Sequence, residues 1–226
     1  MSRTSNPAGT KTEILRTFVE HGGTIALRRR GEVLDLVLGN VVLLSSAALE
    51  TERTFGRLAG EVIPSDGRMT VIIGGLGFGS TLRGVLEVVP SDARVIVVEK
   101  VRAVAEVARA EAADLVAGAL DDPRVTLEQA DVADVIARER DVSAVLLDVD
   151  NGPDWASFRT NARLYADSAL AQAKTSLRPG GMYAVWSGYP ADAFVGRLKR
   201  AGFVARVVPL EERGVVRARA YVGELR

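Results

Sequence analysis

Residues 69–79 read MTVIIGGLGFG, an apolar run that passes directly into a loop containing four glycines. The unbroken Val and Ile residues predict a strand buried on both faces, as in parallel sheets. The glycines permit a tight turn and a close approach of backbone N–H groups to a ligand. Because residues 80–89 have helical spacing, the stretch predicts a strand, a glycine-rich turn and a helix. The motif alone is weak, and a turn that binds nothing is its alternative reading.

Short apolar strands and helical segments alternate through most of the chain beyond this stretch. We expect strands at Ala93–Glu99, Arg124–Ala130, Ala144–Val149 and Met182–Ser187, helices at Val101–Ala117, Val132–Arg140 and Thr160–Leu177, and a closing turn at Arg178–Gly181. This alternation predicts a doubly wound α/β domain with a mostly parallel sheet.

Both ends of the chain follow a different pattern. Phe203–Pro209 and Val215–Val222 lie close together in sequence and predict an antiparallel hairpin, which at the end of a parallel sheet gives the methyltransferase type of this fold. Thr24–Arg30 and Val33–Ser45 predict a small N-terminal β unit, and residues 48–62 have helical spacing. The turn residues Pro64–Gly67 mark the expected boundary.

Composition excludes several classes of protein. The 226 residues include 29 Lys and Arg and 29 Asp and Glu, so no overall basic charge attracts nucleic acid. The absence of cysteine excludes disulfides and thiolate metal sites, and a single histidine excludes a Ser-His-Asp triad and paired-histidine metal motifs. The polar amino terminus and the lack of an apolar run of about 18 residues predict a cytoplasmic protein without a membrane partner.

Acidic residues stand where two of the predicted strands end. Glu99 ends the strand after the glycine loop, and Asp131 follows the next one. The carboxyl ends of parallel strands form one edge, where ligands bind. Glu99 there can accept hydrogen bonds from both ribose hydroxyls, and Asp131 suits the exocyclic amine of adenine. We therefore predict a nucleoside site without a pyrophosphate, rather than an NAD site, formed by Gly75, Gly77, Gly79, Glu99, Lys100, Asp131 and Val132.

A third acidic group follows the fourth predicted strand, in the sequence LDVDNGPDW of residues 147–155. Clustered carboxylates have raised pKa values or require a cation. A metal site is disfavoured because histidine and regular calcium-loop spacing are missing, and a loop that only caps the next helix is the structural alternative. We predict that Asp148 is a catalytic base for an amine, that Asp150 and Asn151 bind the substrate, and that no metal takes part.

The motifs together resemble the spermidine synthase family over roughly residues 69–187. Residues 120–125, LDDPRV, followed by an acidic strand end, are more specific than the glycine loop. Residues 34–62 look like a shortened form of the family's N-terminal strands and helix. The DVDNGPDW segment is similar to a short, divergent bacterial branch. The other matching segments are Gly74–Gly79, Val98-Glu99, Ala130-Asp131, Leu147-Asp148 and Leu177–Gly181.

The resemblance implies a methyltransferase-type fold, a role in polyamine biosynthesis and roles for three residues. Glu99 would hold the ribose, Asp131 would read adenine and Asp148 would prepare the attacking amine. Two family features are absent. Gly77 stands where the family has an acid that grips the aminopropyl ammonium, and residues 49–55 contain no counterpart of the Tyr-His-Glu cluster that lines the amine pocket.

We therefore expect a transferase that alkylates a small-molecule amine with an adenosyl sulfonium. The donor is decarboxylated S-adenosylmethionine or S-adenosylmethionine, and the product is methylthioadenosine or S-adenosylhomocysteine. Methyl transfer to a small molecule, which Gly77 favours, and a non-catalytic adenine-thioether-binding protein are the alternatives. We expect residues 65–226 to form a Rossmann-like nucleoside-binding transferase domain and residues 1–64 to form the small β unit with its connecting helix. Val33–Leu44 is too apolar for so small a unit to cover, which predicts a homodimer.

Overall fold

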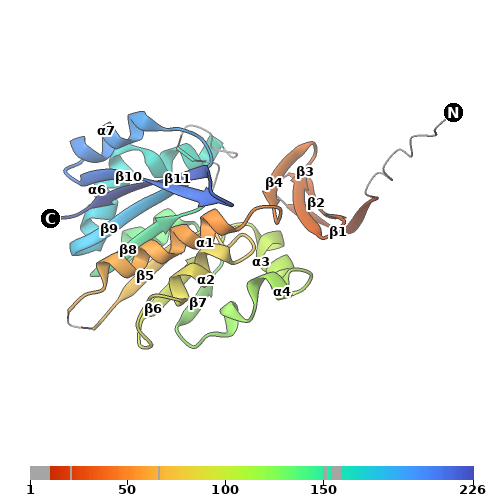
Figure 1. Cartoon of the computed structure of the whole chain (residues 1–226), viewed down its shortest axis with the longest axis horizontal. Coiled ribbons are helices and arrows are strands. Elements are labelled where there is room, and N and C mark those ends of the chain that lie inside the picture. The colour runs from red at the N-terminus through yellow and green to blue at the C-terminus, as the bar shows by residue number, and fades with distance from the viewer. Residues whose placement is uncertain (1–10, 21, 66, 150–151, 154–158) are drawn as a thin grey trace. The chain divides into compact units, whose positions relative to one another are not determined.

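The computed structural model describes residues 11–20, 22–65, 67–149, 152–153 and 159–226 (Figure 1). The chain forms two compact units, Met1–Ala47 and Ala48–Arg226. We expected the division after residue 64. It falls earlier because helix α1 (Glu50–Arg57) packs against helix α2 (Ser80–Leu86) of the second unit.

A seven-stranded sheet in the order β10-β11-β9-β8-β5-β6-β7 forms the centre of the second unit. Strands β5 to β9 are parallel, and β11 runs antiparallel to both β9 and β10. This confirms the predicted doubly wound, mostly parallel sheet with its C-terminal antiparallel hairpin. The bounds are β5 Thr70–Gly74, β6 Arg94–Val98, β7 Val125–Glu128, β8 Val142–Leu147, β9 Leu177–Ser187, β10 Val204–Glu212 and β11 Val215–Glu224.

Helices cover both faces of this sheet (Figure 1). Side chains of α5, α6 and α7 join Ile72, Leu147 and Tyr221 of the strands in one buried apolar cluster. On the opposite face, α1 packs against β10 and β11, and the 3₁₀ helix η1 packs against β8 and β9. The remaining bounds are η1 Leu58–Val62, α3 Arg102–Arg109, α4 Ala113–Val116, η2 Ala119–Asp121, α5 Val132–Arg138, η3 Arg159–Tyr165, α6 Asp167–Ser176 and α7 Asp192–Arg200.

The order of strands places the glycine loop at a binding position. Strand β5 lies between β6 and β8. The chain continues from β5 to β6 and β7 on one side and then returns to place β8 on the other side, so the strand order reverses at β5. The carboxyl edge at such a reversal is where doubly wound proteins bind ligands. The loop after β5, the residue after β6 and the residue after β8 therefore meet at one edge.

Several elements differ from the sequence-based expectation. The helix expected at 101–117 is interrupted at Ala110, where the backbone leaves helical angles. The helix expected at 160–177 begins as η3 and resumes as α6 after the extended residue Ala166. Helix α7 was not predicted. Residues 178–181 belong to strand β9 rather than to a turn, because Gly180 and Gly181 exchange backbone hydrogen bonds with Leu225 near the C-terminus.

The LDDPRV motif has a structural role that its sequence did not reveal. The Arg124 guanidinium donates to the backbone oxygens of Leu86, the last residue of α2, and of Val89 and Pro90, which follow the helix. Its Nε also donates to Asp122 at 2.9 Å. This hydrogen bond, opposed by burial, lowers the pKa of Asp122 to about 2. The motif therefore anchors the end of α2 to the start of β7.

The first unit is a four-stranded antiparallel sheet in the order β1-β2-β3-β4. Its strands are β1 Thr12–Glu20, which was not predicted, β2 Gly23–Arg30, β3 Val33–Leu38 and β4 Val41–Ser45. The single stretch expected at 33–45 is two strands, because Gly39 adopts a positive φ of 58° between them.

An acidic residue of this small sheet explains part of the Arg28–Arg30 run. Asp35 is 1% exposed and accepts hydrogen bonds from Arg28, Arg30 and Ser45. Burial raises its pKa, but these bonds outweigh burial and leave the pKa below its usual value. No described helix of either unit has the length and apolar character that crossing a membrane requires.

Candidate functional site

The glycine loop touches the segment that follows β8. The N–H of Asp148 donates to the Gly74 oxygen at 2.8 Å. Gly75 has a φ of +91°, and a Cβ at this position would lie 2.1 Å from the Asp148 oxygen. Gly77 and Gly79 also have positive φ values, of 53° and 80°. Only glycine at position 75 allows so close an approach, so the loop requires its glycines whether or not a ligand is bound.

Glu99 follows strand β6 and is held by two backbone groups. One carboxylate oxygen accepts the Leu76 N–H at 2.9 Å, and the other accepts the Val101 N–H at 2.8 Å. The residue is only 7% exposed. Glu99 therefore ties the glycine loop to the start of α3, and its carboxylate has a fixed orientation at the sheet edge.

Asp131 lies beyond β7, at the start of α5, and is surrounded by positive charge. It accepts from Lys100 at 3.0 Å, from Arg163 and from the Ala133 N–H at 3.1 Å. Burial raises its pKa, but the bonds from Lys100 and Ala133 and the charge of Arg163 outweigh burial and lower it. Asp131 is therefore ionised and caps α5. Val132, also predicted as a cofactor residue, has its side chain in the apolar core.

Asp148 lies at the same edge of the sheet, but the described residues place no positive charge beside it. Its Oδ2 accepts from the Thr81 hydroxyl at 2.6 Å. No ion pair reaches it within the described residues. Burial is the larger influence and the bond from Thr81 the smaller, and together they raise the pKa of Asp148 to about 6. A carboxyl that titrates near neutral pH and has an unpaired charge is suited to accept and release a proton.

Two further carboxylates, which the sequence did not reveal, lie on the same face of the sheet. Glu52 is on α1 and Glu212 is the last residue of β10. Burial, then the charge of Asp148, then that of Glu212 raise the pKa of Glu52 well above its usual value. Oε2 of Glu212 is buried and accepts no hydrogen bond in the described structure. These three residues form what we call the acidic cluster: Glu52, Asp148 and Glu212.

The sequence contained one signal for Glu52. Residues 49–55 stand where the resemblance places the lining of the amine pocket, but their lack of a Tyr-His-Glu pattern suggested no counterpart. The structure corrects that expectation in part, since an acid of this segment does interact with Asp148. Glu212 had no signal, because η3, α6, β9, α7 and most of β10 lie between it and Asp148 along the chain.

A close crossing of α1 and α2 brings Glu52 and Thr81 to Asp148. A Cβ on Gly56 would lie 2.1 Å from the Thr81 oxygen, and a Cβ on Gly84 would lie 2.0 Å from the Arg53 oxygen. Each helix therefore requires a glycine where it meets the other. The distance between the two helices is set by backbone contact, which gives Thr81 a defined position.

Other predicted site residues lie outside the described part of the chain. These are Asp150 and Asn151, the expected substrate-binding residues. Within the described ranges no group of three or more acidic or histidine side chains is arranged to hold a metal ion. The acidic cluster is thus not arranged as a metal site.

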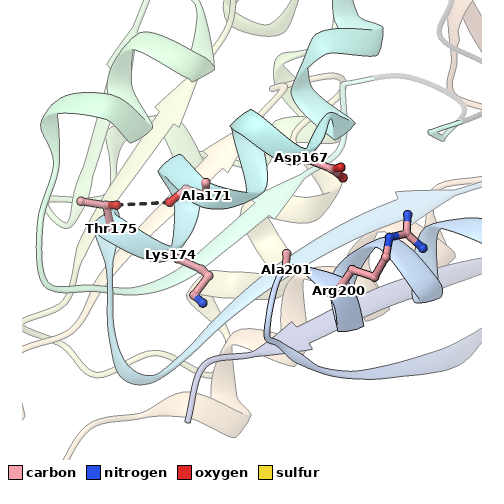
Figure 2. A pocket seen from close by; sticks show the side chains of 6 residues that line it. All are labelled: Asp167, Ala171, Lys174, Thr175, Arg200 and Ala201. Carbon is pink, nitrogen blue, oxygen red and sulfur yellow. Dashed lines mark hydrogen bonds between the residues drawn. The ribbon is translucent and has the colours of Figure 1, made fainter.

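A surface hollow lies away from this edge. It has a volume of about 590 Å³ and lies between α6 and α7 (Figure 2). Figure 2 shows Asp167 at the start of α6, Lys174 and Thr175 near the other end of that helix, and Arg200 at the end of α7. None of the predicted site residues lines it.

Comparison with known proteins identifies the fold. No protein-family model and no curated protein sequence matches the chain. A spermidine synthase solved in complex with the transition-state analogue AdoDATO has a TM-score of 0.72 and 16% identity, with 93% of this chain and 72% of that chain covered. Spermidine synthase from Thermotoga maritima has a TM-score of 0.73 and 16% sequence identity, with the same coverage of both chains.

A third solved structure extends the comparison. A probable spermidine synthase from Corynebacterium glutamicum ATCC 13032 has a TM-score of 0.64 and 15% identity, with 94% of this chain and 80% of that chain covered. At this level of identity the agreement concerns the path of the backbone. The chain has a spermidine synthase-like fold.

Proposed function

We propose that the protein transfers an alkyl group from an adenosyl sulfonium to the nitrogen of a small amine, as an aminopropyltransferase does. The observation that carries this proposal is the contrast at the sheet edge. Two carboxylates, Glu99 and Asp131, are fixed in orientation by their partners, and a third, Asp148, has a pKa of about 6 and no cation beside it among the described residues.

The residues present fit an adenine nucleoside without a pyrophosphate. Glu99 offers a buried, oriented carboxylate for ribose hydroxyls. Both cations that contact Asp131 bind its Oδ2, whereas Oδ1 accepts the Ala133 N–H and has a second lone pair for an exocyclic amine. When bound, the sulfonium supplies a carbon with a good leaving group. Glu99 and Asp131 would hold its nucleoside part, and the glycine loop would lie against it.

The acidic cluster favours a positively charged substrate. Burial and the charges of Asp148 and Glu212 raise the pKa of Glu52 well above its usual value, and the described residues around the cluster supply no cation to it. An ammonium group would reduce this repulsion on binding. It would also replace part of the charge recognition that the family obtains from the loop acid, which here is Gly77.

Asp148 would act as the general base. An aliphatic amine has a pKa near 10.4, so only a small fraction is uncharged at pH 7. As the N–C bond forms and the C–S electron pair stays with sulfur, the nitrogen loses a proton to Asp148. With a pKa of about 6, Asp148 is mostly ionised at pH 7 and can accept it. The reaction would lead to a polyamine.

A thermal-shift screen tests the donor. We expect methylthioadenosine and decarboxylated S-adenosylmethionine to stabilise the protein by about 2.7 kcal/mol at 100 times their dissociation constants. NAD serves as the control and should give no shift. Incubation of the stabilising donor with a series of amines, followed by mass spectrometry, then identifies the product. No stabilisation by any adenine thioether or sulfonium would contradict the proposal.

Methyl transfer from S-adenosylmethionine is the second candidate, and Gly77 favours it. A loop without the acid has no carboxylate to select the decarboxylated donor. If S-adenosylmethionine and S-adenosylhomocysteine stabilise the protein more than the decarboxylated donor and methylthioadenosine do, methyl transfer becomes the better assignment. Binding of either pair without product from any amine tested would favour the non-catalytic alternative.

We also propose that the protein is a homodimer through its first unit. Ile14 and Val19 of β1 and Val41 and Val42 of β4 are exposed, and these strands form the two open edges of the small sheet. Open edges with exposed apolar side chains promote pairing with another chain. Light scattering on the intact chain should give the mass of two chains, and the mass of one chain would refute self-association.

A further inference from the structure

Thr81 makes a contact for which the motifs gave no indication. It lies on the first turn of α2, directly after the glycine loop, and is 2% exposed. Its hydroxyl oxygen lies 2.6 Å from Oδ2 of Asp148 and 3.3 Å from the backbone oxygen of Glu52. A hydroxyl has one proton to donate, and the shorter distance assigns it to Asp148, with the Glu52 oxygen as the weaker acceptor.

This contact differentiates the two oxygens of the carboxylate. Oδ2 is engaged by the hydroxyl, and no group of the described residues donates to Oδ1, so Oδ1 is the oxygen available to accept a proton from a substrate. A hydrogen bond donated to a carboxylate also favours its ionised form. Burial acts in the opposite direction at Asp148 and is the larger of the two influences.

The charged side chains of α1 do not donate a hydrogen bond to Asp148 in the described structure. Glu52 is acidic, and the charge of Asp148 helps to raise the pKa of Glu52 itself, so it supplies no donor to Asp148. Arg53 and Arg57 both donate to the carboxylate of Glu87, the residue directly after α2, at distances of 2.5 and 2.7 Å. The cations of α1 are therefore engaged at the far end of α2 from Thr81.

The other elements packed on this face likewise direct their charges elsewhere. Arg83 of α2 donates to the Leu115 oxygen. Arg206 of β10 pairs with Glu61 of η1. Glu212 of β10 adds negative charge to the acidic cluster. Thr81 is thus the side-chain donor that contacts Asp148 in the described structure.

We propose that Thr81 is a positioning residue for the base. Its hydroxyl fixes Oδ2 of Asp148, leaves Oδ1 for the substrate proton and keeps the carboxylate ionised at neutral pH despite its burial. The close crossing at Gly56 holds the Thr81 backbone and hence the hydroxyl. This inference rests on the proposed role of Asp148 as the base.

The test compares Thr81→Val, which keeps the shape but removes the hydroxyl, with Thr81→Ser, which keeps the hydroxyl. The protonation of Asp148 is followed by NMR of carboxyl carbons in protein labelled at aspartate, with Asp148→Asn used to assign the signal. We expect Thr81→Val to raise the titration midpoint by about one pH unit or more, because a hydrogen bond to a charged group is lost. Thr81→Ser should titrate as wild type does.

Thr51→Val is the matched control, since Thr51 is a buried threonine of α1 that is 3% exposed. It should leave the midpoint unchanged. Chemical unfolding of each variant shows whether it is folded under the conditions of the titration, and Thr81→Ser keeps the comparison valid if the valine variant unfolds. In an active preparation, the acidic limb of the kcat profile should move with the NMR midpoint.

The outcomes separate this inference from the proposed function. An unchanged midpoint in Thr81→Val, or a shift of equal size in Thr81→Ser, would overturn the role of Thr81 even if the transferase activity is found. A raised midpoint in the valine variant alone supports it. Failure of every adenine thioether to bind would contradict the proposed function, and the titration would still measure the effect of Thr81 on Asp148.

Discussion

Asp131 and Asp148 lie at the same edge of one parallel sheet, yet their surroundings are opposite. Asp131 has Lys100 and Arg163 beside it and caps a helix, and its pKa is lowered. In the part of the chain that the structure describes, Asp148 has one side-chain donor, the neutral Thr81, and its pKa is raised to about 6. The same residue type after two strands of one sheet is therefore suited to different roles. A carboxylate paired with cations is suited to hold a ligand in place, whereas an unpaired one is suited to move a proton.

The largest expected effect is on turnover. Asp148→Asn retains the size of the side chain but removes the base, so we expect kcat to fall by roughly 10²–10⁴-fold while methylthioadenosine still binds. Asp131→Asn is the matched change and should weaken donor binding with much less effect on kcat. Steady-state kinetics with the identified donor and amine measure both. Turnover of Asp148→Asn within a few-fold of wild type would place the base elsewhere.

The next effect concerns the helix crossing that positions Thr81. Gly56→Ala places a Cβ 2.1 Å from a backbone oxygen, so α1 and α2 must separate. We expect a loss of about 3 kcal/mol in the free energy of unfolding, at the upper end for overpacked sites. Gly196→Ala on α7 is the control, because its Cβ would meet only an Arg200 nitrogen at 3.5 Å. That variant should be unchanged or slightly more stable, since alanine favours a helix. Urea unfolding of the two variants decides the point.

The pH dependence of the free energy of unfolding should have opposite signs for the ionisation of Asp148 and of Asp131. The folded pKa of Asp148 lies above its usual 3.8, so ionisation destabilises the fold increasingly as pH rises from about 4 through 6. Asp148→Asn, which cannot ionise, should therefore be more stable than wild type at pH 8, by about 2–3 kcal/mol, and similar to it at pH 4. Denaturant unfolding at both pH values tests this. A variant that is less stable at pH 8 would contradict the raised pKa.

Donor binding should depend on Glu99. Glu99→Gln leaves one oxygen to accept a backbone N–H but removes the charge, and we expect the binding of methylthioadenosine to weaken by about 2 kcal/mol. Glu128→Gln, one strand away at the end of β7, is a control for general charge effects. Isothermal calorimetry gives the affinities. Equal binding by wild type and Glu99→Gln would remove Glu99 from the ligand site.

The smallest effect is expected at Asp131. Its lowered pKa stabilises the fold above the usual value of 3.8, and this contribution is lost as pH falls through the lower folded pKa. Because Lys100 and Arg163 are about half exposed, solvent screens the pair, and Asp131→Asn should cost about 1 kcal/mol at pH 7. At pH 3 the difference should shrink. A gain in stability at pH 7 would show that the cations do not offset burial.

The local sequence determined much of this protein. Uninterrupted Val and Ile runs indicated the parallel strands, because burial on both faces removes any polar alternation. The glycine loop and the acids after the strands indicated the binding edge, since parallel strands bring their carboxyl ends together. The C-terminal hairpin was also predicted and is confirmed. Strand β1 was missed because its residues, TEILRTFVE, mix polar and apolar types without a long apolar run.

Tertiary structure alone decided which side chains meet. Thr81 and Asp148 are 67 residues apart, and Asp131 and Arg163 are 32 apart, so no local pattern relates them. Residues 178–181 became part of a strand because the C-terminus pairs with them, overriding the turn preference of Pro and Gly. The proton affinity of Asp148 likewise depends on burial and on the hydrogen bond from Thr81. Both are properties of packing, which a sequence fixes only through the complete fold.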